Sequence, residues 1–147
     1  MKSHWPNLLC ATILALVVRV PISFAQAESP STAAGRFYDE YMGGGVVLKA
    51  LGDRWYTPRF RAVMNAWEND PLQKPIEGNP VLPWKDWAAW RHKLKTEELE
   101  ASADRALVIV TFAIDEKGQP IARLVHLEKV ADNWRVDNVT DPPLKSP

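Results

Sequence analysis

The C-terminal third of the sequence restricts the fold more than any other feature, because strand-like segments there alternate with short turns. Residues 106–114 (ALVIVTFAI) are rich in β-branched and aromatic side chains and predict a strand that is apolar on both faces. Residues 121–130 and 134–139 predict two more strands, each reached through a short turn-forming segment. Residues 94–103 predict a fourth strand, although residues 95–100 also fit a helix. This pattern favours an antiparallel meander.

Helical periodicity precedes the predicted strands. Residues 33–42 fit a helix, and three glycines at 43–45 should break it before a shorter helical piece that ends near Leu51. The pair Thr57–Pro58 marks a second start, because threonine caps helices and proline suits their first turn; apolar residues then recur at helical spacing up to Trp67. Helices followed by an antiparallel meander predict a single α+β domain.

The N-terminus has the three parts of a secretory signal. A short basic start precedes an apolar run from Leu8 to Val18, and Ala25-Gln26-Ala27 fits a signal-peptidase site. A membrane anchor is the alternative, but Arg19 and Pro21 end the run well short of about 20 apolar residues. We therefore predict a cleaved signal over residues 1–27, no stable membrane span afterwards, and a periplasmic or secreted product.

The remaining chain is predicted to divide into three parts. Residues 28–33 are polar and predict a flexible leader, with Ser31 or Thr32 capping the helix that follows. Residues 34–141 form the domain, and residues 142–147 form a C-terminal tail.

The composition argues against a disulfide, a nucleic-acid partner and a metal site in the mature domain. The only cysteine, Cys10, leaves with the signal, so packing rather than a disulfide must stabilise the mature domain. Loss of Lys2 and Arg19 leaves 16 basic against 18 acidic residues, a net charge of −2, and without a basic patch we expect no nucleic-acid partner. His92 and His126 lack neighbours at zinc-like spacing, so we expect neither a metal nor another cofactor.

The order of elements resembles that of the nuclear transport factor 2-like superfamily, also called SnoaL-like or cystatin-like. More narrowly, the chain resembles the bacterial exported family called domain of unknown function 3828. Four segments carry this resemblance: residues 37–41 (FYDEY), 56–60 (YTPRF), 69–71 (NDP) and 134–139 (WRVDNV). The resemblance implies N-terminal helices packed on a curved antiparallel sheet in a cone shape, and it implies export. The family offers no activity that transfers to particular residues.

A tryptophan-rich segment is the most unusual feature of the sequence. Trp84, Trp87 and Trp90 would share one side of a short helix over residues 84–91. They suit an aromatic platform for a sugar, an aromatic ligand or a partner protein, but they equally suit a packed end of the core. Arg54, Arg59 and Arg61 cluster near the second helix start, and arginine is enriched in protein interfaces. We assign ligand or partner binding to Trp84, Trp87, Trp90, Tyr56 and Arg59.

Two classes of function remain open from the sequence. The first is a non-catalytic exported domain, a monomer or homodimer, that binds a protein partner or a small apolar molecule at the cone mouth; an immunity or inhibitor protein is one form of it. The alternative is a SnoaL-like isomerase, cyclase or hydrolase acting on a small hydrophobic substrate. Its candidate bases are His126, which shares strand parity with Leu124 and Val130, and Asp86. A structural envelope protein is a third possibility.

Overall fold

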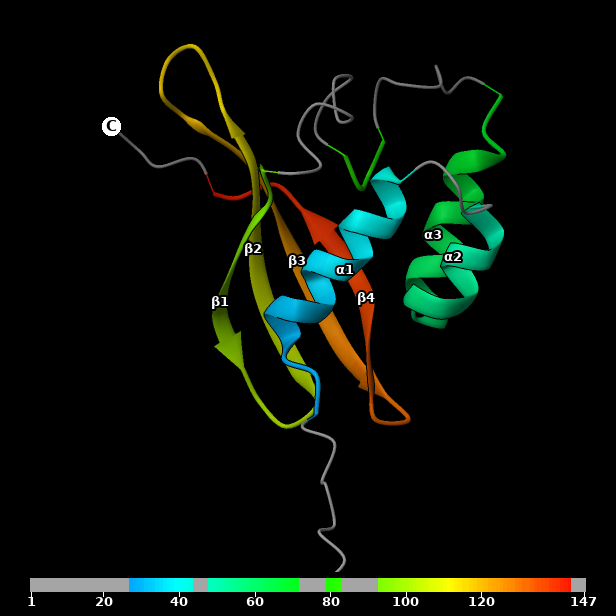
Figure 1. Ribbon diagram of the computed structural model, residues 1–147. Helices are drawn as coiled ribbons and strands as arrows, with labels where there is room; N and C mark the ends of the chain where they lie inside the picture. The colour runs from blue at the N-terminus through cyan, green and yellow to red at the C-terminus, as the bar shows by residue number, and fades with distance from the viewer. Residues whose placement is uncertain (1–26, 44–47, 72–78, 83–92, 144–147) are drawn as a thin grey trace, which may run out of the picture.

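The described residues of the computed structural model, 27–43, 48–71, 79–82 and 93–143, form three helices followed by four strands (Figure 1). The elements are α1 (Pro30–Met42), α2 (Leu48–Trp55), α3 (Pro58–Glu68), β1 (Lys95–Ala101), β2 (Arg105–Ile114), β3 (Pro120–Val130) and β4 (Asn133–Thr140). The strands pair antiparallel in the order β1-β2-β3-β4. The predicted α+β class and the meander are therefore confirmed.

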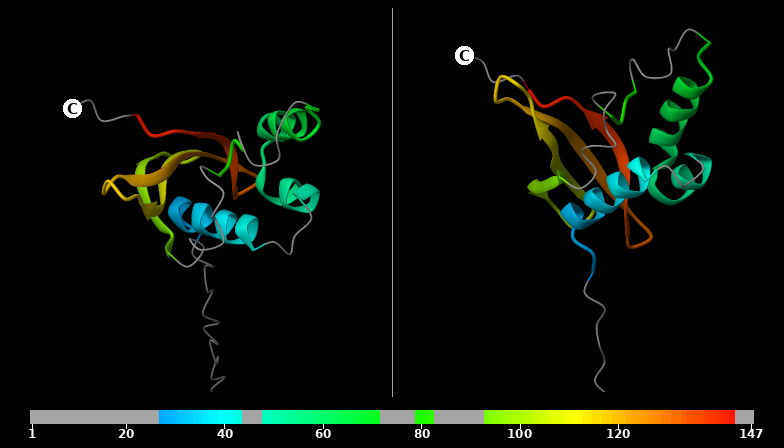
Figure 2. Two further views of the ribbon diagram at one scale, coloured as in Figure 1. Left: turned by 90° about the horizontal axis from the view of Figure 1, so that it is seen from above. Right: turned by 45° about the horizontal axis from the view of Figure 1, so that its top comes forward.

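Helix α1 covers one face of this open sheet, packing chiefly across β1 and β2 (Figure 2). Alternate residues of β2 point toward the helix, and Val108, Val110 and Phe112 are fully buried there. On β3, the buried Val125 lies opposite Val108, and the buried Leu127 lies opposite Ala106. The closed cone implied by the family resemblance stays a prediction.

Helix α1 begins earlier than its periodicity predicts. The Ser29 side chain accepts a hydrogen bond from the Thr32 backbone N–H at 3.2 Å, so Ser29 rather than Ser31 or Thr32 is the N-cap. Pro30 then occupies the first turn, and Ala33 is completely buried. The predicted flexible leader at 28–33 is thus part of α1 from residue 30 onward.

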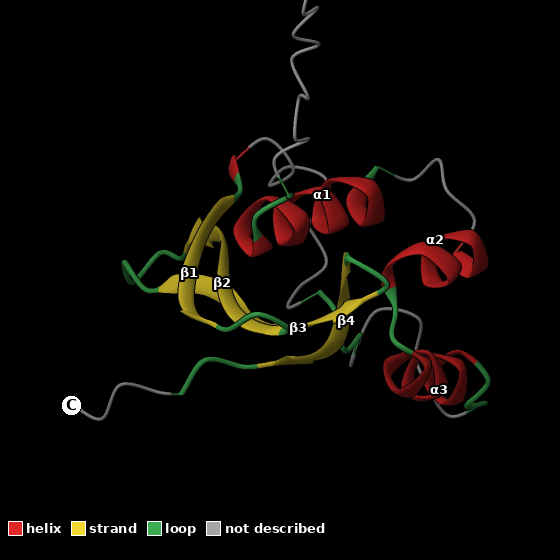
Figure 3. Cartoon of the chain, turned by 90° about the horizontal axis from the view of Figure 1, so that it is seen from below, coloured by secondary structure: helices red, strands yellow, loops and turns green. Residues whose placement is uncertain are grey.

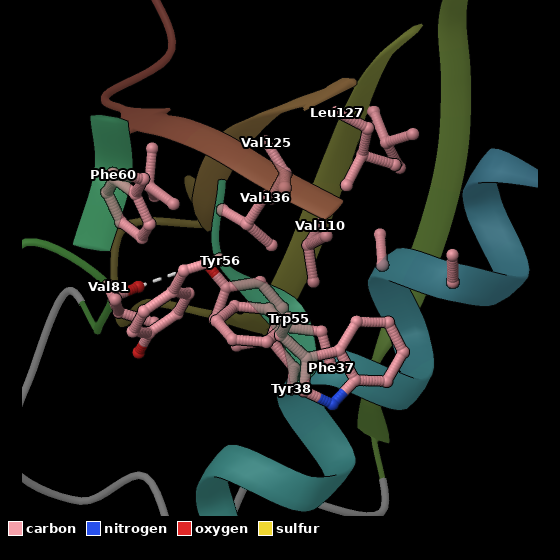
Figure 4. Close-up of a cluster of buried hydrophobic side chains, with 14 of the residues drawn as sticks. Phe37, Tyr38, Trp55, Tyr56, Phe60, Val81, Val110, Val125, Leu127 and Val136 are labelled. Atoms are coloured by element: carbon pink, nitrogen blue, oxygen red, sulfur yellow. Dashed lines mark hydrogen bonds between the residues drawn. The ribbon is translucent and has the colours of Figure 1, made fainter. Parts of the chain in front are cut away.

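Aromatic side chains fill the space between the helices and the sheet (Figure 4). The Phe37 ring packs edge-on against Tyr38 at a centroid distance of 4.9 Å, and Trp55 and Tyr56 each lie 6.0 Å from Phe37. The Tyr38 hydroxyl donates a hydrogen bond to the Val81 carbonyl at 3.0 Å. Burial raises the pKa of the Tyr38 and Tyr56 hydroxyls, so both remain protonated donors. This packing is the means of stabilisation expected of a thiol-free mature domain.

The junction between α2 and α3 is fastened to the β4 edge of the sheet. Tyr56 forms an isolated parallel bridge with Val136, and the Thr57 N–H donates to the Val136 carbonyl at 2.9 Å. The Thr57 hydroxyl donates to Asp137 at 2.8 Å and also accepts from the Phe60 N–H, which caps α3. One residue therefore fixes both the start of α3 and its position beside β4.

Strand β1 lies at the opposite edge of the sheet. The strand interpretation of residues 94–103 is confirmed, and the helical alternative for residues 95–100 is wrong. The register between β1 and β2 shifts between Glu98 and Glu100, and every residue of β1 except Thr96 is exposed. The break after Met42 also agrees with the predicted glycine interruption, while the predicted helix at 84–91 lies outside the described residues.

Candidate binding surface

The sheet face turned away from α1 carries apolar side chains. Leu107 and Ile109 on β2 and Leu124 and Val130 on β3 point to this side and are only half-buried. An antiparallel sheet with one solvated face normally alternates apolar and polar residues. No described helix lies over this face of β2 and β3 (Figure 3). We call this side of the sheet, as defined by these residues, the open face.

Helix α3 stands beside the open face at the β4 edge, on the other side of the sheet from α1 (Figure 3). Between the start of α3 and β3 lies a hollow of about 620 Å³, which we call the α3–β3 hollow. It is lined by Thr57, Pro58, Arg59, Arg105, Ala106, His126, Leu127, Glu128, Val130 and Asp137. Because Val130 lines the hollow, the hollow continues the open face.

Charged groups in the hollow are held in fixed positions. The Arg59 guanidinium donates to the Asp137 carboxylate through Nε at 3.1 Å and also through Nη2. This fork-like pairing fixes the plane of the guanidinium, which remains largely exposed. Arg105 lies opposite Glu128 in the register of β2 and β3. The hollow thus combines an apolar floor with charges of both signs at its rim, as protein interfaces do.

The residues predicted to bind occupy different environments. Arg59 lies at the rim of the α3–β3 hollow, as a surface contact requires. Tyr56 is only 3% exposed, and its ring packs against Phe60 at 5.0 Å, so the structure places it in the core. Its role there is to anchor the α2–α3 junction. Trp84, Trp87 and Trp90 lie outside the described residues.

His126, the candidate catalytic base that the structure describes, does not lie in an enclosed apolar pocket. His126 does share the side of Leu124 and Val130, but that side is the open face rather than the face under α1. Its Nε2 lies 3.3 Å from the Thr140 hydroxyl. Asp86 lies outside the described residues. Among the residues described, no group of three or more His, Cys, Asp or Glu is arranged to hold a metal ion.

The three predicted interface arginines separate in the structure. Arg59 lines the α3–β3 hollow, Arg54 pairs with Glu40, and Arg61 pairs with Asp53.

Within the part of the chain that is described, no helix has the length and apolar character needed to cross a membrane.

The apolar residues of the open face were not predicted as a binding site. Their signal was nevertheless in the sequence, because residues 106–114 were expected to be apolar on both faces. Among the described elements, α1 covers one face of β2, and Leu107 and Ile109 on the other face stay half-buried.

The fold is similar to that of two solved chains. A chain of the selenomethionine form of the type VI effector–immunity complex Tae3–Tai3 from Ralstonia pickettii matches with a TM-score of 0.59 and 19% identity, over 80% of this chain and 100% of that chain. A chain of the native form of the same complex matches with a TM-score of 0.58 and 18% identity, over 80% and 98%. No protein-family model and no curated protein matches the sequence. At this identity the similarity establishes a shared fold.

Proposed function

We propose that this chain is an exported immunity-type inhibitor, a non-catalytic domain that binds and neutralises an effector protein. The observation that carries the proposal is the similarity in fold to a chain crystallised within an effector–immunity complex, nearly all of which this chain covers. The similarity extends over 80% of this chain and 100% of that chain.

The chemistry of the open face supports a protein as the partner. Half-buried Leu107, Ile109 and Leu124 provide an apolar centre, and the Arg59–Asp137 pair provides part of a charged rim. An apolar centre inside a polar rim is the usual anatomy of a protein interface. We therefore assign effector binding to the open face together with the α3–β3 hollow.

Three parts of the proposal extend beyond the described surface. The leader at 1–27 would export the chain to the periplasm or the medium, where an effector acting in the envelope can be intercepted. The tryptophan-rich segment at 84–90 would enlarge the contact area. The order of helices and strands also supports membership of the nuclear transport factor 2-like superfamily.

A protection assay with a matched pair of variants tests this function. Cells would export either Tae3 or a protein encoded by a gene neighbouring that of this chain, with or without this chain. Wild-type protein should restore growth against one of these effectors and elute with it as a stable complex. Ile109→Lys, on the open face, should abolish both effects because it places a charge in the apolar centre.

Ile114→Lys is the matched control, because Ile114 ends the same strand and is already 62% exposed. It should protect and bind as the wild type does. Absence of protection and binding with every effector would refute the proposed function. If Ile109→Lys still binds the effector, the inhibitor function is retained but the open face is excluded as the effector-binding surface.

A further inference from the structure

A second, smaller hollow lies where α1, the end of α2 and the β3–β4 turn meet. Its volume is about 290 Å³, and we call it the arginine notch. The notch is lined by Glu28, Arg36, Arg54, Trp55, Asn133, Trp134 and Arg135. The backbone of Tyr56 and Thr57 contacts β4 at Val136. Val136 separates Trp134 and Arg135, which line the notch, from Asp137, which lines the α3–β3 hollow.

Aromatic rings hold the notch in shape. The Arg36 guanidinium lies over the Trp55 ring, 5.4 Å from its centroid. The Trp55 indole N–H donates to the Glu40 carboxylate at 2.8 Å, and the Trp134 indole N–H donates to the Glu28 carbonyl at 2.9 Å. Both rings are almost fully buried, so they form rigid walls for the arginines.

Positive charge in the notch exceeds the negative charge paired with it. Arg36 pairs with Glu28 and Arg54 pairs with Glu40, each through a single guanidinium nitrogen. Among the described residues, Arg135 donates only to the carbonyls of Asp53 and Tyr56, at 3.4 and 3.5 Å. Three guanidinium groups thus face two carboxylates.

Arg135 is the least satisfied of the three arginines. Its Nε is buried and has no hydrogen-bond partner within the described parts of the chain, whereas guanidinium groups normally use their planar fork of donors. Because no described carboxylate pairs with Arg135, an anion bound in the notch would neutralise a charge that the fold leaves uncompensated. The notch is therefore an incomplete site with one positive charge to spare.

We propose that the arginine notch binds a carboxylate side chain, an aspartate or glutamate carried by a loop of the effector. This rests on the proposed function for the identity of the partner. One uncompensated positive charge matches one carboxylate rather than a polyanion, and the notch has room for a side chain but not for a helix. Arginine and tryptophan together are the residues that dominate binding energy at protein interfaces.

The first experiment needs no effector. Purified ¹⁵N-labelled protein is titrated with the peptide acetyl-Gly-Glu-Gly-Glu-Gly-amide while the indole N–H resonances of Trp55 and Trp134 are followed. We expect saturable shifts with this peptide and none with its glutamine analogue. The apparent Kd should rise about tenfold or more in Arg135→Gln. Arg54→Gln, at a side chain 64% exposed, should weaken binding without risk to folding.

Lys117→Gln, at the exposed β2–β3 turn, is the matched control and should titrate as the wild type does. Three results would overturn the proposal: no saturable shift with the glutamate peptide, equal shifts in both notch variants, or saturation by inorganic phosphate at a lower concentration than by the peptide. The last result would identify a general anion site instead.

The second experiment separates this proposal from the proposed function. The affinity of wild type, Arg135→Gln and Lys117→Gln for the protective effector is measured by calorimetry. Loss of affinity in Arg135→Gln alone supports the notch. Equal affinity of all three proteins would refute carboxylate binding by the notch but retain the inhibitor function. Absence of binding by the wild type would refute the inhibitor function and, with it, the effector as the partner of the notch.

Discussion

Raising the pH above about 10 should destabilise this domain strongly, because two of its tyrosines are buried and the third is partly buried. The chain has three, Tyr38, Tyr41 and Tyr56, and burial raises the pKa of each hydroxyl. In the unfolded chain each tyrosine titrates near its ordinary pKa of about 10. Above that pH the unfolded chain releases protons that the folded chain retains. The stabilisation is therefore complete below pH 10 and is lost as the pH rises toward the folded pKa values.

The size of the effect follows from the linkage relation. At pH 11 a tyrosine that ionises only when unfolded favours unfolding by about 1.4 kcal/mol. Tyr38 and Tyr56 are 0% and 3% exposed and are hardly screened by solvent, so together they contribute about 3 kcal/mol. That is a large fraction of the roughly 5–15 kcal/mol by which domains are stable.

Urea unfolding at pH 8, 9, 10 and 11, followed by circular dichroism, measures this loss. Tyr38→Phe provides the control, because lysines titrate in the same range in both proteins. At pH 8 the free energy of unfolding of the variant should be about 1 kcal/mol lower than that of the wild type, because the variant lacks the Tyr38 hydrogen bond to Val81. Its further loss between pH 8 and pH 11 should be about 1.4 kcal/mol smaller than in the wild type. Tyrosinate absorbance that rises with a midpoint near pH 10 while the circular dichroism stays native would refute the reasoning.

Two other substitutions test individual contacts of the fold. Thr57→Ala removes both the α3 cap and the hydrogen bond to Asp137, so it should lower the free energy of unfolding by about 2 kcal/mol in urea titrations, whereas Thr57→Ser should retain most of the stability. Ala131→Asn should raise the free energy of unfolding by about 1 kcal/mol, because Ala131 adopts a φ of 47° that asparagine tolerates better. A decrease in the thermal midpoint of Ala131→Asn would contradict this account of the β3–β4 turn.

Local patterns in the sequence predicted the strands, the end of α1 and the start of α3, whereas the helical piece expected to end near Leu51 continues to Trp55. The Thr57–Pro58 pair located the start of α3, and the same type of pair at Ser29–Pro30 was present but not used. Using it would have placed the start of α1 at residue 30. The polar residues at 28–33 are typical of a flexible leader, but the cap formed by Ser29 and the proline at residue 30 start the helix there.

The candidate site was less predictable because it depends on contacts between distant segments. Tyr56 directly precedes a helix and looks accessible in the sequence, but its bridge to Val136 joins residues 80 positions apart and buries its ring. The strand parity of His126 was predicted correctly, yet parity does not show which face α1 will cover. The arginine notch likewise joins α1, α2 and β4, so no local pattern indicates it.

Both borders of the described sheet are unsuited to growth by further strands. Glu97, Glu98 and Glu100 place like charges along β1, and the register shift there bends the hydrogen-bonding edge. On β4, the backbone of Tyr56 and Thr57 already occupies the position beside Val136. Copies of the chain crowded together should therefore resist cross-β polymerisation, which would let the protein reach high concentrations without aggregating.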